Sequence, residues 1–176
     1  LQYGDGPNNV ILAPGRINII GEHTDYNEGL AMPAAINRWV CTAISKCHQN
    51  SFSIFSMNYE QSVTISSDSK NKLPELWIKL VYTAIYIIKS EYTVQGGGNI
   101  VIGGNIPIGY GLSSSAAFVI SITAAFLRLF NIQIKDRELA KLCQKIETTA
   151  LGINCGLLDQ YGIILSKQDH CLMIDF

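Results

Sequence analysis

One stretch decides how this chain folds and what it can bind: Gly103-Gly104-Asn105-Ile106-Pro107-Ile108-Gly109-Tyr110-Gly111-Leu112-Ser113-Ser114-Ser115-Ala116-Ala117. A glycine-rich turn leads into three serines and then into an apolar helix. Glycines let backbone N–H groups approach an anion closely, because no Cβ stands in the way. The helix that follows adds its free N–H groups and the positive end of its dipole. The stretch therefore predicts a phosphate-binding loop whose serine hydroxyls contact phosphate or a bound Mg²⁺.

This loop is not a Walker loop. Its spacing differs from GxxxxGK[ST], and no lysine follows the last glycine. Taken alone, the same stretch could be a flexible connection that precedes a buried helix. The rest of the sequence is needed to distinguish a phosphate-binding loop from a flexible connection.

Composition and charge exclude several classes of protein. The chain has 176 residues, of which 48% are hydrophobic and 15% charged, and its net charge is −1. The thirteen basic residues are scattered, so we expect no nucleic acid and no anionic membrane surface as a partner. Residues 92–127 carry no formal charge, but the apolar part of that segment, 116–127, is too short to cross a bilayer.

The cysteines indicate a reducing compartment. They number five, which is odd, and no two of them have CxxC spacing. Both features argue against a disulfide framework and against a zinc site. The N-terminal residues also lack the basic and apolar regions of a signal peptide. We therefore expect a cytoplasmic protein.

The hydrophobic pattern predicts strands first and helices later. The expected strands cover 10–13, 17–20, 36–44, 52–55 and 99–102, with a Pro14-Gly15-Arg16 turn between the first two. The expected helices cover 73–89, 115–130 and a segment that starts at Asp136 as its N-cap and is broken by Gly152. Residues 161–165 and 171–176 are predicted to form a final pair of strands. This order is typical of a layered α+β fold and differs from the alternation of a parallel α/β fold.

Two polar clusters supply candidate binding groups. Residues 15–27 hold one arginine, two carboxylates, one histidine and two amides between hydrophobic strands. Such a set could hydrogen-bond a polyhydroxylated ligand from several directions, although each member could also be a loop residue that caps its own turn. In the second cluster, an acidic residue follows an apolar pair after a glycine break: Gly156-Leu157-Leu158-Asp159-Gln160.

Together, the loop and the two clusters resemble the GHMP small-molecule kinases, and within them the galactokinase family. Residues 13–27 (Ala13-Pro14-Gly15-Arg16-Ile17-Asn18-Ile19-Ile20-Gly21-Glu22-His23-Thr24-Asp25-Tyr26-Asn27) are similar to the galactokinase signature almost residue for residue. Residues 109–117 resemble the ATP-phosphate motif, and residues 152–160 resemble the stretch that carries the family's catalytic aspartate. The resemblance implies the GHMP kinase N-terminal fold (ribosomal protein S5 domain 2-like), with mixed or antiparallel sheet layers and packed helices.

The same resemblance implies transfer of the ATP γ-phosphate to the anomeric hydroxyl of galactose, the first committed step of galactose catabolism. Asp159 would face the C1 hydroxyl with Arg16 beside it, while Glu22, His23 and Asp25 would bind sugar hydroxyls. A neighbouring guanidinium favours the ionised carboxylate, so Asp159 would be charged but a weak base. Whether Asp159 removes the proton or only positions the hydroxyl stays open.

For the nucleotide, the resemblance implies that the triphosphate lies in the serine loop, on Gly109, Gly111, Ser113, Ser114 and Ser115. Mg²⁺ would be held by Glu147 and one of the serines, for which we choose Ser114. The family also has a second, C-terminal domain with further sugar contacts. We therefore expect 1–176 to be the N-terminal domain alone, which carries the main catalytic groups and is inactive without its own C-terminal domain.

Other functions stay open at this point. A related kinase could act on N-acetylgalactosamine or arabinose, and only the pocket around the sugar would separate these enzymes. A non-catalytic sensor could bind galactose and ATP and regulate a partner, although a sensor does not need the serine run, Arg16 and Asp159 together. A structural domain with a glycine-rich loop would show no stabilisation by sugar.

Overall fold

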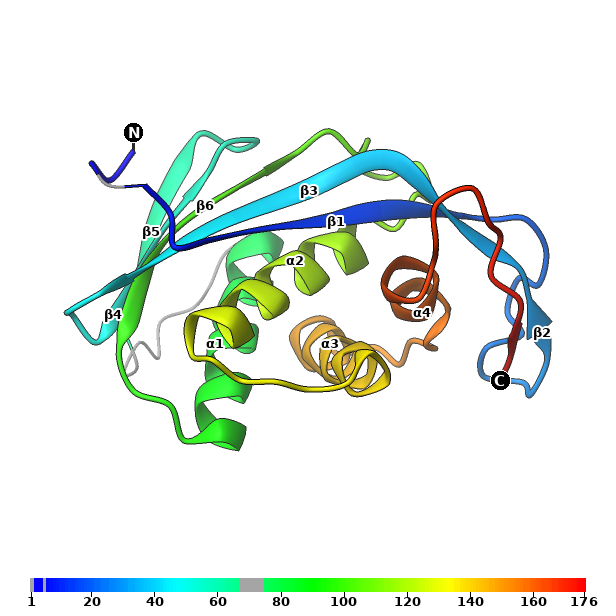
Figure 1. The fold of residues 1–176 in the computed structure, drawn as a ribbon. Helices are drawn as coiled ribbons and strands as arrows, with labels where there is room; N and C mark the ends of the chain where they lie inside the picture. The colour runs from blue at the N-terminus through cyan, green and yellow to red at the C-terminus, as the bar shows by residue number, and fades with distance from the viewer. Residues whose placement is uncertain (1, 5, 67–74) are drawn as a thin grey trace.

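The chain forms one main sheet with helices against one of its faces (Figure 1). A computed structural model describes residues 2–4, 6–66 and 75–176. The main sheet has the strand order β1-β3-β6-β4-β5, and β2 pairs with β7 in a separate two-stranded sheet. The strands are β1 (Asn9–Asn18), β2 (Leu30–Ala31), β3 (Pro33–Cys47), β4 (Ser51–Ser56), β5 (Gln61–Ser66), β6 (Gly97–Gly104) and β7 (Ile174–Asp175). The helices are α1 (Leu76–Tyr92), α2 (Ser114–Leu129), α3 (Asp136–Leu151) and α4 (Leu158–Ile164).

The main sheet is mixed. β4 and β6 pair in parallel, whereas the other neighbouring strands are antiparallel. Strands and helices thus form two layers, which confirms the predicted α+β class with a mixed sheet. Within the described residues, no helix is long and apolar enough to span a membrane.

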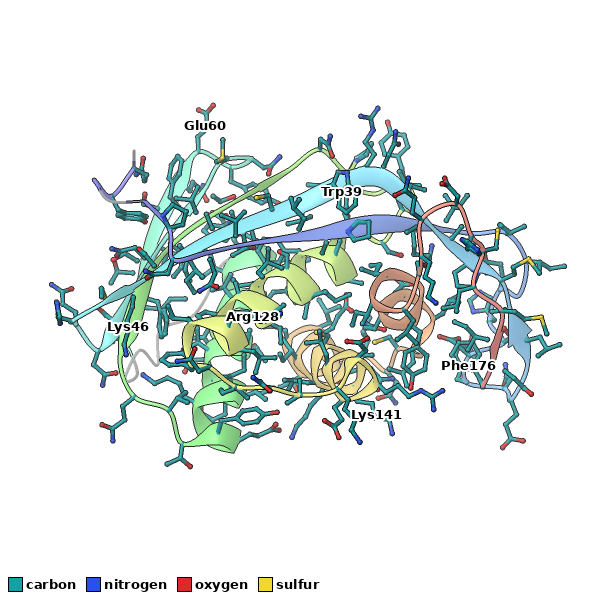
Figure 2. The ribbon with its side chains drawn as sticks, viewed as in Figure 1. Trp39, Lys46, Glu60, Arg128, Lys141 and Phe176 are labelled. Atoms are coloured by element: carbon teal, nitrogen blue, oxygen red, sulfur yellow. The ribbon has the colours of Figure 1, made fainter. Side chains whose placement is uncertain are left out.

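The core lies between the sheet and the helices, where the side chains in Figure 2 fill the space. Strand pairing places Ile44, Ile100 and Ile54 side by side, and each is 0% exposed. Phe126 of α2 meets Phe52 edge to face, with ring centroids 5.0 Å apart. Because α2 carries no charge before Arg128, it can lie between the sheet and the other helices (Figure 1).

A polar contact ties α2 to the sheet inside this core. The hydroxyl oxygens of Thr42 on β3 and Ser121 on α2 lie 2.7 Å apart, and both residues are 0% exposed. Each hydroxyl satisfies the other, so neither is a buried polar group without a partner.

The N-terminal half of the sheet differs from the prediction in one respect. Residues 10–13 and 17–20 were expected as two strands, but β1 runs without a break from Asn9 to Asn18 beside β3. The expected Pro-Gly-Arg turn is instead an irregularity in the strand pairing, since the register shifts between Pro14 and Arg16, where three residues of β3 lie opposite one residue of β1. Ala13 and Gly15 are buried, and the Arg16 side chain is only 13% exposed, so two consecutive residues point toward the helices.

The remaining strand and helix predictions had mixed outcomes. The strands predicted at 36–44, 52–55 and 99–102 and the helix at 115–130 are confirmed, as β3, β4, β6 and α2. The helix predicted at 73–89 corresponds to α1, with Leu73 and Pro74 outside the described residues. β2 and β5 were not predicted.

The predicted boundaries of α3 were right at one end only. Gly152 ends the helix in a left-handed conformation, as expected. At the other end the N-cap is Lys135 and not Asp136. The reason is Glu138, whose carboxylate accepts a hydrogen bond from the Lys135 backbone N–H at 3.0 Å.

The predicted final pair of strands was wrong. Residues 158–164 form helix α4, and within 171–176 only Ile174 and Asp175 form a strand. A short apolar run such as Tyr161–Leu165 fits a buried strand or a buried helix equally well, because periodicity cannot separate them at that length. The contacts of α4 with β1, β3, α2 and α3 decide in favour of the helix.

Candidate active site

The glycine–serine loop connects β6 to α2 and has the backbone conformation that a phosphate loop needs. Gly109 and Gly111 have φ values of 84° and 69°, in the left-handed region that glycine tolerates. Ser113 at the N-cap of α2 also has a positive φ, 56°, and its side chain does not cap the helix. The first N–H groups of α2 are therefore left for another acceptor, such as an anion.

The hydroxyl of Ser113 points instead to Asp159. It donates to Oδ2 of that carboxylate at 2.7 Å. Arg16 from β1 binds the other oxygen, donating from Nε to Oδ1 at 2.9 Å and also from Nη2. The Arg16 side chain is 13% exposed and that of Asp159 35% exposed, so the ion pair lies at the edge of the core with the carboxylate open to a ligand.

Arg16 also holds the loop in place. Its Nη1 donates to the carbonyl of Gly111 at 3.0 Å, and its backbone N–H donates to the carbonyl of Leu112 at 3.2 Å. The irregular pairing of β1 with β3 at Gly15 makes these contacts possible, because Gly15 and Arg16 then both face the helices. Three segments distant in sequence thus meet at one point: β1, the glycine–serine loop and the first turn of α4.

Glu147 of α3 forms a second carboxylate centre behind the serines. Glutamate side chains of helices are usually solvated, but Glu147 is only 7% exposed. Ser115 donates to its Oε1 at 2.6 Å, and Gln160 donates to its Oε2 at 2.8 Å. Burial raises the pKa of Glu147, and the charge of Asp159 raises it further, while the bonds from Ser115 and Gln160 act in the opposite direction.

The structure also separates the roles of the serines. Ser115 is the serine that contacts Glu147, whereas Ser114, the one chosen from the sequence, lines a neighbouring pocket. A hydroxyl and a carboxylate oxygen side by side are suitable ligands for Mg²⁺, which takes the rest of its ligands from phosphate and water.

Asp25 brings the polar segment 21–29 against the start of α4. Its Oδ2 accepts a hydrogen bond from the backbone N–H of Leu158 at 3.2 Å. Gly156 lies so close that a Cβ there would be 1.7 Å from the same oxygen. Asp25 therefore binds the backbone of the residue that precedes Asp159 in α4.

Glu22 and His23 are exposed on the same segment. His23 has a φ of 60°, and its Nδ1 lies 2.5 Å from the hydroxyl of Tyr26. Among the described residues, no hydrogen bond joins either side chain to Asp159. The structure thus brings Arg16, Asp25, Ser113 and Asp159 together and leaves Glu22 and His23 at the surface beside them.

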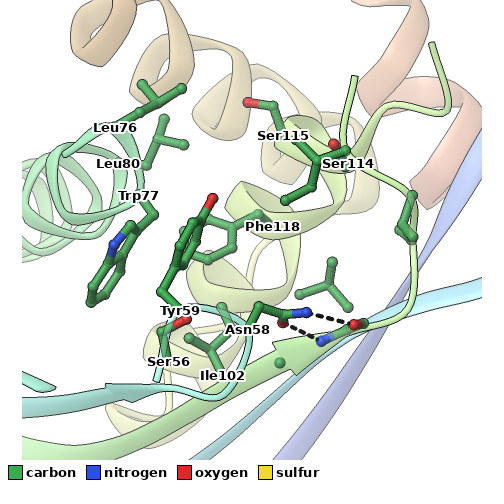
Figure 3. A pocket seen from close by; sticks show the side chains of 15 residues that line it. Ser56, Asn58, Tyr59, Leu76, Trp77, Leu80, Ile102, Ser114, Ser115 and Phe118 are labelled. Atoms are coloured by element: carbon green, nitrogen blue, oxygen red, sulfur yellow. Dashed lines mark hydrogen bonds between the residues drawn. The ribbon is translucent and has the colours of Figure 1, made fainter. Parts of the chain in front are cut away.

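A pocket beside the serines was missed by the sequence analysis (Figure 3). The rings of Tyr59 and Trp77 stack at its side, with centroids 5.8 Å apart and planes 10° apart. Ser114 and Ser115 lie at its other end, and Leu80, Ile102, Ile106 and Phe118 supply apolar lining. Tyr59 comes from the β4–β5 turn and Trp77 from α1, and no spacing pattern links a turn residue to a helix residue.

Asn58 fixes the turn that carries Tyr59. Its side-chain amide donates to the carbonyl of Gly104 at 2.9 Å, and its Oδ1 accepts from the Gly104 N–H at 2.8 Å. These two bonds, drawn as dashed lines in Figure 3, tie the turn to the end of β6. The pocket wall and the glycine–serine loop therefore share one anchor.

Comparison with known proteins places this site in a family. Residues 79–167 match the family described as GHMP kinases N terminal domain, and residues 2–46 match the galactokinase galactose-binding signature. A galactokinase from Staphylococcus carnosus is 36% identical over 177 residues, which cover 98% of this chain and 46% of that protein. The chain therefore belongs to the GHMP kinases, of which it carries the N-terminal domain.

Solved structures agree on the fold. The structure of Lactococcus lactis galactokinase complexed with galactose superposes with a TM-score of 0.89 at 33% identity, over 98% of this chain and 46% of that one. Methanococcus jannaschii mevalonate kinase superposes with a TM-score of 0.82 at 24% identity, over 98% of this chain and 54% of that one, and so shows the same fold. The GHMP kinase N-terminal fold expected from the motifs is confirmed. The chain spans 44% to 46% of the length of the curated galactokinases that it matches.

Proposed function

We propose that this chain is the N-terminal part of a galactokinase, which phosphorylates the anomeric hydroxyl of galactose with ATP. The observation that carries the proposal is the Asp159 carboxylate held between Arg16 and Ser113, at the point where the glycine–serine loop enters α2. The galactokinase signature match over residues 2–46 and the galactose complex of the Lactococcus lactis relative support galactose as the substrate. The parent protein would contain a second, C-terminal domain that completes the site, and we place it in the cytoplasm.

In the proposed reaction, the C1 hydroxyl oxygen of galactose forms a bond to the γ-phosphorus of ATP. The bond from that phosphorus to the β–γ bridging oxygen breaks, and ADP leaves with the electron pair. Asp159 would orient the hydroxyl and accept its proton. Arg16 balances the charge of Asp159, while the transition state itself is stabilised mainly by positioning and by charge.

The nucleotide would lie across the loop and the neighbouring pocket. The phosphates would take the N–H groups at Gly109, Gly111 and the start of α2, with hydroxyls from the serine run. The base would enter the apolar pocket beside Tyr59 and Trp77, where aromatic rings suit a flat heterocycle. Mg²⁺ would be held by Glu147 and Ser115, and when bound it would neutralise charge on the phosphates.

Asp25, Glu22 and His23 would bind the sugar. Asp25 is fixed against α4 beside Asp159, so its free oxygen can accept from a sugar hydroxyl. Charged acceptors form short, directional hydrogen bonds, which is how a site separates one sugar epimer from another. Glu22 and His23 are exposed on the same segment, where they would contact the bound sugar.

The test is sugar-dependent ADP release by the full-length parent, with galactose, N-acetylgalactosamine, arabinose and glucose as substrates. We expect turnover that is selective for galactose and is lost in Asp159→Asn. The 176-residue chain measured in the same assay shows how far the second domain is needed. A parent that binds galactose but releases no ADP with any of these sugars would exclude the kinase and favour a sensor.

A further inference from the structure

Gln160 is a buried amide that the proposed mechanism does not yet use. It follows Asp159 in the first turn of α4 and is 1% exposed. Its Nε2 donates to Oε2 of Glu147 at 2.8 Å, while Ser115 donates to Oε1 of the same carboxylate at 2.6 Å. Glu147 on α3 is thus held from two sides, by the first turn of α2 and by the first turn of α4.

The carbonyl oxygen of the Gln160 side chain is in an unfavourable position. Oε1 of Gln160 is buried, and within the described residues it has no hydrogen-bond partner. A buried acceptor without a partner destabilises a fold, whereas an apolar side chain of similar volume would only pack. The packing of α4 therefore does not account for an amide at this position. The hydrogen bond that the amide donates to Glu147 does account for it.

Two hydrogen-bond donors fix the orientation of the Glu147 carboxylate, which a single donor would leave free to rotate. A carboxylate with a donor on one oxygen can still turn about its Cγ–Cδ bond, but donors on both oxygens hold its plane. The hydroxyl of Ser115 and the amide of Gln160 leave lone pairs on Ser115 Oγ and on the Glu147 oxygens for a cation on the loop side. Ligand carboxylates in metal sites are commonly oriented in this way by residues that do not touch the metal.

We propose that Gln160 is a positioning residue, which orients the carboxylate of Glu147 toward the divalent cation of the phosphate site. The inference rests on the proposed function, because it assigns Glu147 and Ser115 to that cation. Gln160 acts through Glu147 and touches neither sugar nor phosphate. Because Asp159 and Gln160 are adjacent on α4, one turn of helix sets both the carboxylate that faces the sugar and the carboxylate that faces the cation.

The test uses the full-length parent with Gln160→Met, which keeps the length of the side chain and removes the donor. Gln160→Leu is the second variant, should the methionine variant fail to fold. Ile163→Ala is the matched control, because Ile163 is a buried core residue of the same helix whose apolar side chain cannot hydrogen-bond to Glu147. The readouts are Mn²⁺ affinity in the presence of ADP, by electron paramagnetic resonance, and the Mg²⁺ concentration for half-maximal ADP release.

We expect Gln160→Met to weaken Mn²⁺ binding about tenfold or more and to raise the Mg²⁺ requirement similarly, with the KM for galactose within about twofold of the parent. Ile163→Ala should lower the melting temperature and leave both metal readouts unchanged. In a Glu147→Gln background, Gln160→Met should cause no further loss of Mn²⁺ affinity, since the two residues act as one unit.

Either of two results would overturn the inference: a Gln160 variant with a lower melting temperature but an unchanged Mn²⁺ affinity, or a Mn²⁺ affinity that Glu147→Gln does not alter. The fate of the proposed function is read separately, from ADP release by the unmodified parent. If that release fails while Glu147→Gln and Gln160→Met both weaken Mn²⁺ binding, the positioning role stands and the kinase proposal falls.

Discussion

The contact between Gly156 and Asp25 allows a strong test of how the sugar-facing carboxylates are placed. In Gly156→Ala, the new Cβ would lie 1.7 Å from Oδ2 of Asp25 and 2.1 Å from its Cγ. A Cβ does not approach another atom closer than about 3.0 Å, so the carboxylate would have to retreat by about 1.3 Å. Its hydrogen bond to the N–H of Leu158, already 3.2 Å long, would break.

Because a short side chain can rotate away, the cost to folding should be modest. A hydrogen bond to a charged acceptor contributes about 1.5–3 kcal/mol, and water can replace part of that contribution for a half-buried carboxylate. The free energy of unfolding should therefore fall by about 1–2 kcal/mol. The cost to function should be larger, since the displaced carboxylate loses its place beside Asp159, and we expect the KM for galactose to rise about 10- to 100-fold.

The assay is steady-state ADP release by the full-length parent, with melting temperatures measured on the same samples. Gly6→Ala is the control, because a Cβ at Gly6 would meet no atom within 4 Å. Asp25→Ala removes the clashing group, so Gly156→Ala should add nothing to the KM in that background. A folded Gly156→Ala variant with an unchanged KM for galactose would refute the reasoning that Asp25 is held in place for the sugar.

Three further predictions concern the pocket, the core and Glu147. Tyr59→Ala should raise the KM for ATP about tenfold and leave the KM for galactose unchanged, since Tyr59 is 45% exposed and stacks on Trp77; an unchanged KM for ATP would place the base elsewhere. Ser121→Ala, which leaves the buried Thr42 hydroxyl without its partner, should lower the free energy of unfolding by about 1–3 kcal/mol in urea, and the double variant with Thr42→Val should cost less than the sum of the single changes, because no hydroxyl is then left without a partner. Burial raises the pKa of Glu147. With EDTA present to remove metal ions, the native state therefore keeps the Glu147 proton at a pH at which the unfolded chain has released it. Stability should then fall as pH rises above the ordinary value of 4.5, and Glu147→Gln should abolish this slope in unfolding measurements at pH 5 to 8.

The sequence predicted the strands and helices wherever the hydrophobic period was long. Helix α2 is an example, because its apolar run of more than ten residues predicts a buried helix. The hydrophobic period gave wrong predictions where tertiary contacts determine the secondary structure. Pro14-Gly15-Arg16 has turn chemistry, yet pairing with β3 on both sides keeps it extended, with a register shift in place of the turn. Residues 161–165 were too few to show a period, and packing made them a helix.

The geometry of the candidate site was predicted only in part. Arg16 and Asp159 were expected to lie together, and the structure pairs them. The burial of Glu147 could not be predicted, because it depends on Ser115 and Gln160, which come from other helices. The stacked Tyr59 and Trp77 were missed for the same reason, since a turn and a helix become neighbours only when the fold is complete.

The irregular pairing beside Gly15 makes the position of Arg16 depend on the length of β3 as well as on β1. Ahead of the irregularity, residues 11, 13 and 15 of β1 face the helices, and after it residues 16 and 18 do. Three residues of β3, 36–38, lie opposite the single residue 15. Removing two of these three would give one register along the whole strand pair, and regular alternation would then place Arg16 on the face opposite to Gly15, away from the helices. A short deletion in β3, a strand that does not carry the guanidinium, would therefore remove that guanidinium from the site.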